Sequence, residues 1–263
     1  MRLLRRQGLG AAIVWCVACA SLGGLALGCD DKPPKKMERL TPPPPEDDPL
    51  PLPKPKSAPT FRIDDLGPLV GFSRSMLVTP DGQDSATGRA QLTSDLAAEK
   101  EYITDKVVVI QVDRKAQPEW VALYLKEVFA LSPKSVLIET ESRPEYPKSI
   151  EFVSRLAQTQ ADPCTIVGTV TEQRATAIWR VSGGTARKRP RGMSGPDLTR
   201  TADTIQTMFK GCKSDLFIVH AAPGVEWGMI YDLAAAGLAV PDSPLKRAGL
   251  PETRPTPGQA VTL

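Results

Sequence analysis

The chain has 263 residues, of which 41% are hydrophobic and 24% are charged, and its formal net charge is +3. This length allows one or two ordinary domains, and the composition is that of a soluble fold. A net charge this small does not indicate nucleic acid or an anionic membrane as the partner of the whole protein.

The N-terminus has the pattern of a bacterial export signal. Three arginines within the first six residues precede residues 8–28, which carry no charge. This is the arrangement of a secretory signal or of a membrane anchor. The ending LALGC resembles a lipobox in which Cys29 accepts the lipid, although Leu27 stands where a small residue is commoner. An uncleaved single-span anchor is the alternative.

Both alternatives place the remainder of the chain outside the cytoplasm, because the N-terminal arginines favour the cytoplasmic side. The expected location is therefore the periplasmic side of the inner or the outer membrane of a Gram-negative bacterium, with residues 1–28 as the signal peptide. Residues 29–60 have clustered prolines, balanced charges and no apolar periodicity, which predicts a disordered tether. A plain spacer is favoured over a PxxP-type ligand. Residues 244–263 are also proline-rich and are expected to form a flexible tail.

Between these ends, strand and helix patterns alternate. Runs of β-branched residues predict strands over 107–113, 135–140, 164–170, 175–183 and 216–222. Apolar residues at helical spacing predict helices over 118–131, 145–158, 198–212 and from 227 to Gly237. A hairpin-like stretch is expected over 183–198. This order predicts an α/β fold, a two-layer sandwich with helices packed on a mixed sheet.

Three expected strand-to-helix turns share one pattern. Each has a proline, then a glutamate followed by an aromatic residue, and the pairs are Glu119–Trp120, Glu145–Tyr146 and Glu226–Trp227. A glutamate in the first helical turn complements the helix dipole. A recurring element of this kind indicates architecture rather than an active site.

Two cysteines, Cys164 and Cys212, lie outside the N-terminal segment. In an oxidising compartment they predict a disulfide, and two separately buried thiols are the alternative. No Cys or His spacing indicates a metal site. The single histidine, His220, ends a predicted strand, where a structural role is the ordinary case.

The stretch DLFIVHAAPGVEWGMIYDLAAAGL resembles the periplasmic domain of the ExbD/TolR family of biopolymer-transport proteins. In that family a strand, a polar turn and a helix follow a hairpin and a first helix, and residues 175–240 match this order. The stretch VVVIQVDRKAQPEWVALYLKEVFALSPKSVLIET resembles the same unit again, with its hairpin expected within residues 72–98. The resemblance thus implies two degenerate copies, residues 61–171 and 172–243.

Family members carry a transmembrane helix with an aspartate that serves proton-driven work. Residues 8–28 contain no carboxylate, and an ionisable group within the bilayer is what marks a proton relay. Proton transfer is therefore not expected here. The resemblance implies instead a non-catalytic envelope lipoprotein that contacts peptidoglycan or a partner protein of a transport or energy-transducing complex. No cofactor is expected.

The densest basic stretch is ARKRPRG, which contains Arg187, Lys188, Arg189 and Arg191. Arginine forks suit carboxylates and phosphates, so this loop is a candidate site for anions or peptidoglycan. A solvated hairpin tip is the alternative. No nucleic-acid partner is expected, because no aromatic residues interleave the basic ones.

Two other functions remain as alternatives. The first is a structural protein that dimerises by pairing sheet edges. The second is a cell-wall-acting enzyme, for which the sequence offers no GxSxG motif, P-loop or metal-ligand cluster.

Overall fold

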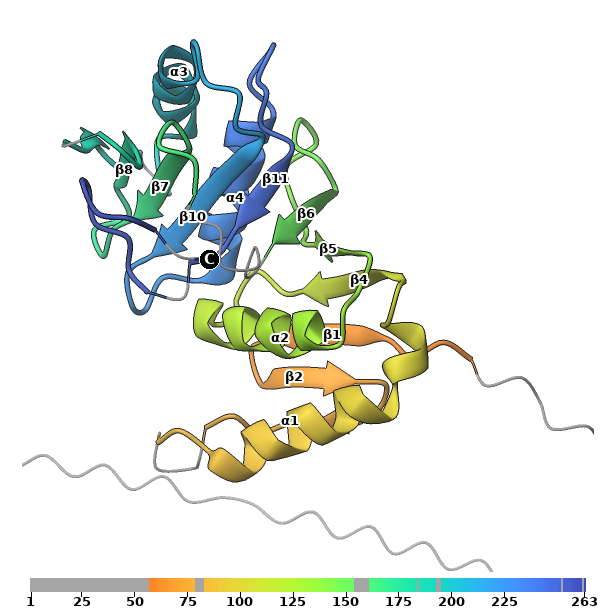
Figure 1. Ribbon diagram of the computed structural model, residues 1–263. Coiled ribbons are helices and arrows are strands. Elements are labelled where there is room, and N and C mark those ends of the chain that lie inside the picture. The colour runs from red at the N-terminus through yellow and green to blue at the C-terminus, as the bar shows by residue number, and fades with distance from the viewer. Residues whose placement is uncertain are drawn as a thin grey trace, which may run out of the picture. The chain divides into compact units, whose positions relative to one another are not determined.

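The computed structural model describes residues 57–78, 83–153, 161–183, 185–192, 195–251, 253–261 and 263 (Figure 1). These residues belong to one compact unit, Pro55–Leu263. The predicted signal sequence, Cys29 and nearly all of the predicted tether lie outside the described residues. In the part of the chain that is described, no helix is both long enough and apolar enough to cross a membrane.

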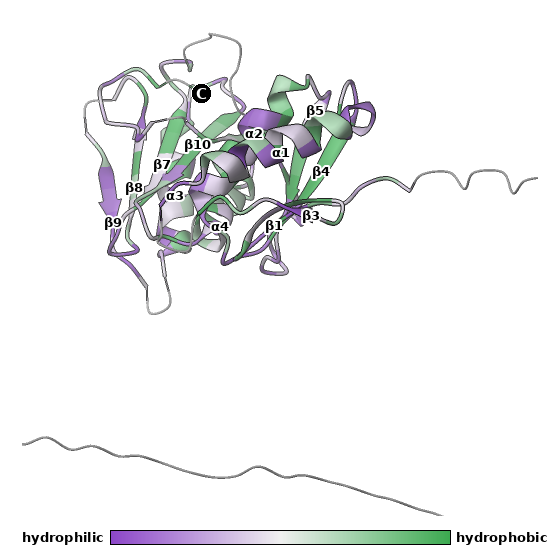
Figure 2. Cartoon of the chain, turned by 90° about the horizontal axis from the view of Figure 1, so that it is seen from below, coloured by the Kyte–Doolittle hydropathy of each residue, from purple (hydrophilic) through white to green (hydrophobic). Residues whose placement is uncertain are grey.

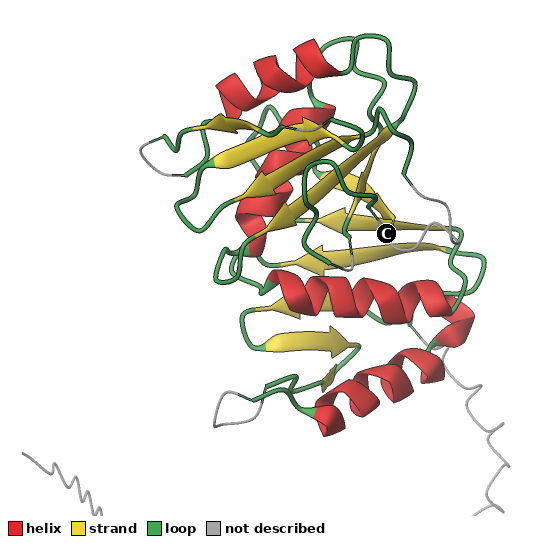
Figure 3. Cartoon of the chain, turned by 60° about the vertical axis from the view of Figure 1, so that its left-hand side comes forward, coloured by secondary structure: helices red, strands yellow, loops and turns green. Residues whose placement is uncertain are grey.

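Within the described residues, one mixed sheet runs through the unit (Figure 3). It has 11 strands in the order β3-β2-β1-β4-β5-β6-β11-β10-β7-β8-β9. Its N-terminal half consists of β1 (Phe61–Asp64), β2 (Gly67–Val70), β3 (Ser73–Arg74), β4 (Val107–Val112) and β5 (Ser135–Glu139), with the helices α1 (Ala86–Ala98) and α2 (Pro118–Ala130) and a 3-10 turn, η1 (Lys100–Tyr102). Its C-terminal half consists of β7 (Ile166–Val170), β8 (Thr176–Arg180), β9 (Arg187–Arg189), β10 (Leu216–Ala221) and β11 (Arg247–Gly249), with α3 (Leu198–Met208) and α4 (Trp227–Leu238). The strand β6 (Ser149–Val153) lies between the halves. The expected α/β class is therefore correct.

The two halves repeat one topology. In the first, β1, β2 and β3 form an antiparallel meander, and β4 and β5 then follow on the other side of β1 in parallel, each after a helix. In the second, β7, β8 and β9 form the meander, and β10 and β11 follow in the same way. The two copies therefore span residues 61–139 and 166–249 and occupy opposite ends of the sheet (Figure 1). The expected boundary at residue 171 instead falls in the turn between β7 and β8.

The strand β6 corrects the helix that was expected over residues 145–158. Ile150 and Phe152 are buried in the helix-side core, whereas Glu151 between them is only half-buried. This alternation has the period of a strand. The helix prediction relied on the helical spacing of Ile150, Val153, Leu156 and Ala157, and only the first two of these residues are described. Residues 154–160 lie outside the described residues.

The C-terminal segment is part of the fold, and the expectation of a flexible tail over residues 244–263 is wrong. Residues 247–249 form β11, which pairs in parallel with both β6 and β10. Further along, Val261 and Leu263 are buried against the sheet. Because β11 has only three residues, its place depends on its two neighbouring strands rather than on any local pattern.

The helix α1 occupies the second half of the stretch in which a hairpin was expected for the first copy. Ser85 caps this helix, since its Oγ accepts a hydrogen bond from the backbone nitrogen of Gly88 at 3.0 Å. The meander of the first copy comes instead from residues 61–74. The Pro-Asp-Gly turn lies outside the described residues and is flanked by an isolated bridge between Val78 and Asp84.

The two faces of the sheet are covered differently in the two copies. On the helix side, one apolar core runs through both copies. On the opposite face of the second copy, Trp179 and Ile218 are buried in a cluster that includes Val261 of the C-terminal segment. On the same face of the first copy, Val107 and Val109 are 50% and 39% exposed. Figure 2 shows β4, β7 and β10 as apolar strands and β9 as a hydrophilic one.

Candidate functional site

Two adjoining cavities open near the carboxyl ends of β4 and β5, where the β4–α2 turn approaches the loop of residues 140–148. Their volumes are about 670 Å³ and 520 Å³, and both are lined by Arg114, Glu141, Ser142 and Arg143. We call these two cavities the central cleft. Ligand sites of open α/β sheets lie at this edge, so the central cleft is a candidate functional site.

The guanidinium of Arg114 lies at the centre of the cleft and joins the two copies. Its Nη1 and Nη2 donate to the carboxylate oxygens of Asp232 on α4, at 3.0 and 2.7 Å. Nη1 also donates to the backbone oxygen of Glu141 at 2.6 Å. This bidentate pair raises the pKa of Arg114 above its ordinary value, against the opposing effect of partial burial.

The N-terminus of α4 also contacts the β4–α2 turn. The backbone nitrogens of Trp227 and Gly228 donate to the carbonyl oxygens of Ala116 and Arg114, at 3.0 and 2.8 Å. A Cβ atom on Gly228 would lie 2.9 Å from the Cβ of Arg114, so only glycine lets the two elements approach this closely. Because these two amides already have acceptors, they do not offer the anion site that a free helix N-terminus provides.

Trp227 supports the cleft through Thr140, one of the residues that line it. It is fully buried, its Nε1 donates to Thr140 Oγ1 at 2.9 Å, and its ring packs against Phe152 and Tyr231. The hydroxyl of Tyr231 donates to the backbone oxygen of Pro147 at 3.2 Å, and burial raises the pKa of this phenol to about 12. These contacts give Trp227 a packing role between β5, β6 and the loop of residues 140–148.

Other charged side chains line the cleft with both signs. Arg62, Arg143 and Lys148 contribute cations, and none of the three has an ion pair within the described residues. Arg143 lies over the ring of Tyr146, 6.0 Å from its centroid, and burial raises the pKa of Tyr146. Since Asp113, Glu139 and Glu141 contribute the opposite charge, the cleft suits a polar ligand with groups of both signs rather than a simple anion.

Replacing Asp232 with asparagine should lower the free energy of unfolding by about 1–3 kcal/mol. The substitution removes the charge that Arg114 faces, and the estimate lies below the value for a fully buried pair because Arg114 is 37% exposed. Chemical denaturation of residues 55–263 measures the change. Asp84→Asn is the matched control, since the Asp84–Arg89 pair is largely exposed, and it should change stability by less than about 0.5 kcal/mol. Equal losses in the two variants would contradict a special role for Asp232.

The three turns that the sequence grouped together are not equivalent. Glu226 precedes the first residue of α4, whereas Glu119 and Trp120 lie within the first turn of α2. The pair Glu145–Tyr146 leads into the strand β6 and not into a helix, so its expected place at a strand-to-helix turn is wrong. Tyr146 lines the cleft instead.

The basic stretch is not a loop with one charged surface. Arg187, Lys188 and Arg189 form the edge strand β9, in which neighbouring side chains point to opposite faces. Arg189 lies on the helix side, where its Nε donates to Thr204 Oγ1 of α3 at 2.7 Å. Lys188 therefore lies on the other side of the sheet. Arg191 follows the strand and is exposed.

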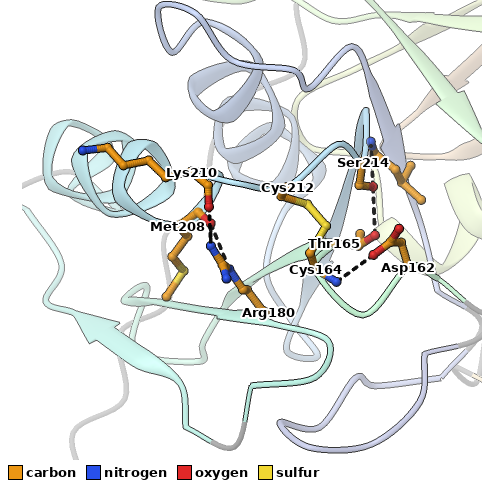
Figure 4. The surroundings of a disulfide bond; sticks show 9 residues. Asp162, Cys164, Thr165, Arg180, Met208, Lys210, Cys212 and Ser214 are labelled. Atoms are coloured by element: carbon orange, nitrogen blue, oxygen red, sulfur yellow. Dashed lines mark hydrogen bonds between the residues drawn. A yellow bond between two sulfur atoms is a disulfide. The ribbon is translucent and has the colours of Figure 1, made fainter.

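The expected disulfide between Cys164 and Cys212 is present (Figure 4). It joins the residues that precede β7 and β10, which are adjacent parallel strands. Beside it, Thr165 and Ser214 share a hydrogen bond of 2.8 Å between their hydroxyl groups. The guanidinium of Arg180 donates to the backbone oxygens of Met208 and Lys210 at the end of α3, so covalent and polar contacts together fasten this corner of the second copy.

Sequence reasoning did not identify Arg114 or Asp232. The available signal was Asp232 itself, a lone carboxylate within the apolar helix WGMIYDLAAAGL, because a buried charge requires a partner. In the described part of the chain, no cluster of three or more His, Cys, Asp or Glu side chains is placed to hold a metal ion. Comparison with known proteins adds no relative: no family, no curated protein and no solved structure matches the chain.

Proposed function

We propose that this chain is a non-catalytic, ExbD/TolR-like binding module of the cell envelope. It contacts a partner protein through the sheet face of its first copy on which Val107 and Val109 are exposed. We place it on the periplasmic side of the membrane, anchored through Cys29, on the sequence pattern of the N-terminus. The repeated order of hairpin, helix, strand, helix and strand supports the likeness to that family.

The observation that carries the proposal is the difference between the two copies on the face opposite the helices. In the second copy, the chain's own C-terminal segment covers this face and buries Val261 and Leu263 against it. In the first copy, Val107 and Val109 on β4 stay exposed, and Leu137 lies beside Val109 on β5. Exposed apolar patches mark interaction sites. In the second copy this face is covered by an extended segment with apolar side chains. We infer that a partner segment of the same kind binds the exposed face of the first copy.

The alternatives receive less support. The edge strands β3 and β9 have two and three residues, and short, charged edges disfavour dimerisation by strand pairing. The division of the basic stretch between two faces weakens the case for one peptidoglycan-binding loop. A catalytic role is disfavoured at the central cleft, because Arg114 and Asp232 already form an ion pair with each other.

The test is site-specific photo-crosslinking in cells that produce the full-length chain. A photoreactive residue at position 109 should form a covalent product with one envelope protein, and the product should disappear when Val107 is also replaced with lysine. The same photoreactive residue at Glu119, which is exposed on α2, serves as the matched control and should not yield that product.

Mass spectrometry of the product decides between the functions. A product that contains two copies of this chain would replace the proposal with the assembly alternative. If position 109 gives no product and the purified chain sediments with insoluble peptidoglycan, the partner is the cell wall and the proposed protein contact is wrong.

A further inference from the structure

A separate cavity lies on the sheet face of the second copy, between the C-terminal segment and the strands β7 to β9. Its volume is about 610 Å³. Lys188 of β9, Thr169 of β7 and Trp179 of β8 contribute from the sheet, and Arg254 contributes from the C-terminal segment. We call this cavity the C-terminal pocket. Residues 254–257 form the part of its lining that faces the sheet.

Two cations from distant parts of the chain line this pocket. Neither Lys188 nor Arg254 has an ion pair within the described residues, and the one acidic residue among the lining side chains is Glu172. The charged side chains that line the pocket are thus two cations and one carboxylate, which leaves a net positive charge. A net positive charge attracts an anion.

The indole of Trp179 adds a second, independent observation. Trp179 is 2% exposed, and its Nε1 has no hydrogen-bond acceptor among the described residues. The indole nitrogen is a donor only, and a buried donor without an acceptor indicates an unassigned water or ligand. An anion in the pocket would supply a hydrogen-bond acceptor for Trp179 Nε1.

We propose that the C-terminal pocket binds a small oxyanion, a carboxylate or a phosphate, held between Lys188 and Arg254 and accepting a hydrogen bond from Trp179. The hydroxyl of Thr169 provides a further donor, while Ala177 and Pro255 give the pocket apolar walls for a short body attached to the anion. This site is independent of the proposed partner contact, which lies on the first copy. Failure of one leaves the other standing.

The test follows the side-chain indole signals of the full-length chain by NMR in detergent, with tryptophan labelled by nitrogen-15. The chain has four tryptophans, and a Trp179→Phe variant identifies the signal of interest. Three probes are titrated: N-acetylalanine, its uncharged amide, and inorganic phosphate. The Trp179 signal should shift in a saturable manner with an anionic probe and not with the amide. The probe that binds more tightly distinguishes a carboxylate from a phosphate.

Variants on β9 make the test specific to one face of the sheet. Lys188→Gln should weaken binding roughly tenfold, because it removes a charge-assisted hydrogen bond. Arg187→Gln is the matched control, since Arg187 is the neighbouring residue on the same strand and points to the opposite face, and it should leave the affinity unchanged. Arg254→Gln should weaken binding as Lys188→Gln does. A Trp179 signal that no probe shifts, an equal response to the amide, or equal effects of the two β9 variants would overturn the proposal.

Discussion

Replacing Trp227 with alanine is expected to lower the free energy of unfolding by about 3–5 kcal/mol, the range for truncating a large aromatic side chain within a core. The indole is fully buried, and its ring centroid lies 5.4 Å from that of Phe152. Removing it leaves a cavity between α4 and the sheet and also leaves the hydroxyl of Thr140 without its donor. Both losses fall where the two copies meet.

The measurement is chemical denaturation of residues 55–263, followed by far-ultraviolet circular dichroism because the substitution removes a fluorophore. Trp120→Ala is the matched control. Trp120 follows a glutamate in the same sequence pattern, but it is only partly buried at the surface of the core, so its loss should cost about 1–2 kcal/mol. Similar losses at both positions would contradict the larger packing contribution expected of Trp227.

The elements that the sequence predicted well are those whose secondary structure follows from their own residues. Five of the six residues of β4 are valine or isoleucine, and this run of β-branched residues predicts a strand. The helix α2 begins with a proline in its first turn, where no amide hydrogen is needed. In both cases a few consecutive residues carry the information. The disulfide could also be predicted from the sequence, because only two cysteines lie outside the N-terminal segment and the expected compartment is oxidising.

The elements that the sequence missed depend on distant neighbours. The strand β11 contains a charged residue and a glycine among its three residues, and only its pairing with β6 and β10 makes it a strand. Gly237 was expected to end α4, yet the helix continues to Leu238. A Cβ at Gly237 would lie 2.6 Å from the ring of Phe217, so this glycine permits close packing of the helix on the sheet.

The candidate site was missed for the same reason. Arg114 and Asp232 are 118 residues apart and belong to different copies. Nothing near either residue shows that the β4–α2 turn of one copy receives the helix N-terminus of the other. By contrast, the basic stretch was visible in the sequence, but its division between two faces follows from the strand geometry of β9. The density of basic residues along the chain therefore predicted one charged surface, but the fold places these side chains on two faces of the sheet.

Removing the disulfide is expected to have an effect of similar size to the loss of Trp227, by a different mechanism. Cys164 and Cys212 are separated by 48 residues, and closing a loop of that length lowers the entropy of the unfolded chain by an amount worth about 4 kcal/mol. The double variant Cys164→Ser and Cys212→Ser should lose stability by about this amount at neutral pH in the absence of reductant. Wild-type protein in reductant should lose a similar amount, provided that the thiols stay reduced.

A matched control separates the covalent link from the contacts around it. Ser214→Ala removes the hydrogen bond to Thr165 beside the disulfide and should cost only about 1 kcal/mol. Thiol titration of unfolded, unreduced residues 55–263 should find no free cysteine, because both cysteines of this segment are paired. Two free thiols, or a double variant as stable as the wild type, would show that the bond does not form in the protein. Hydrogen bonds alone would then stabilise the region around Arg180. The second copy would unfold at a lower denaturant concentration than expected for a disulfide-linked protein.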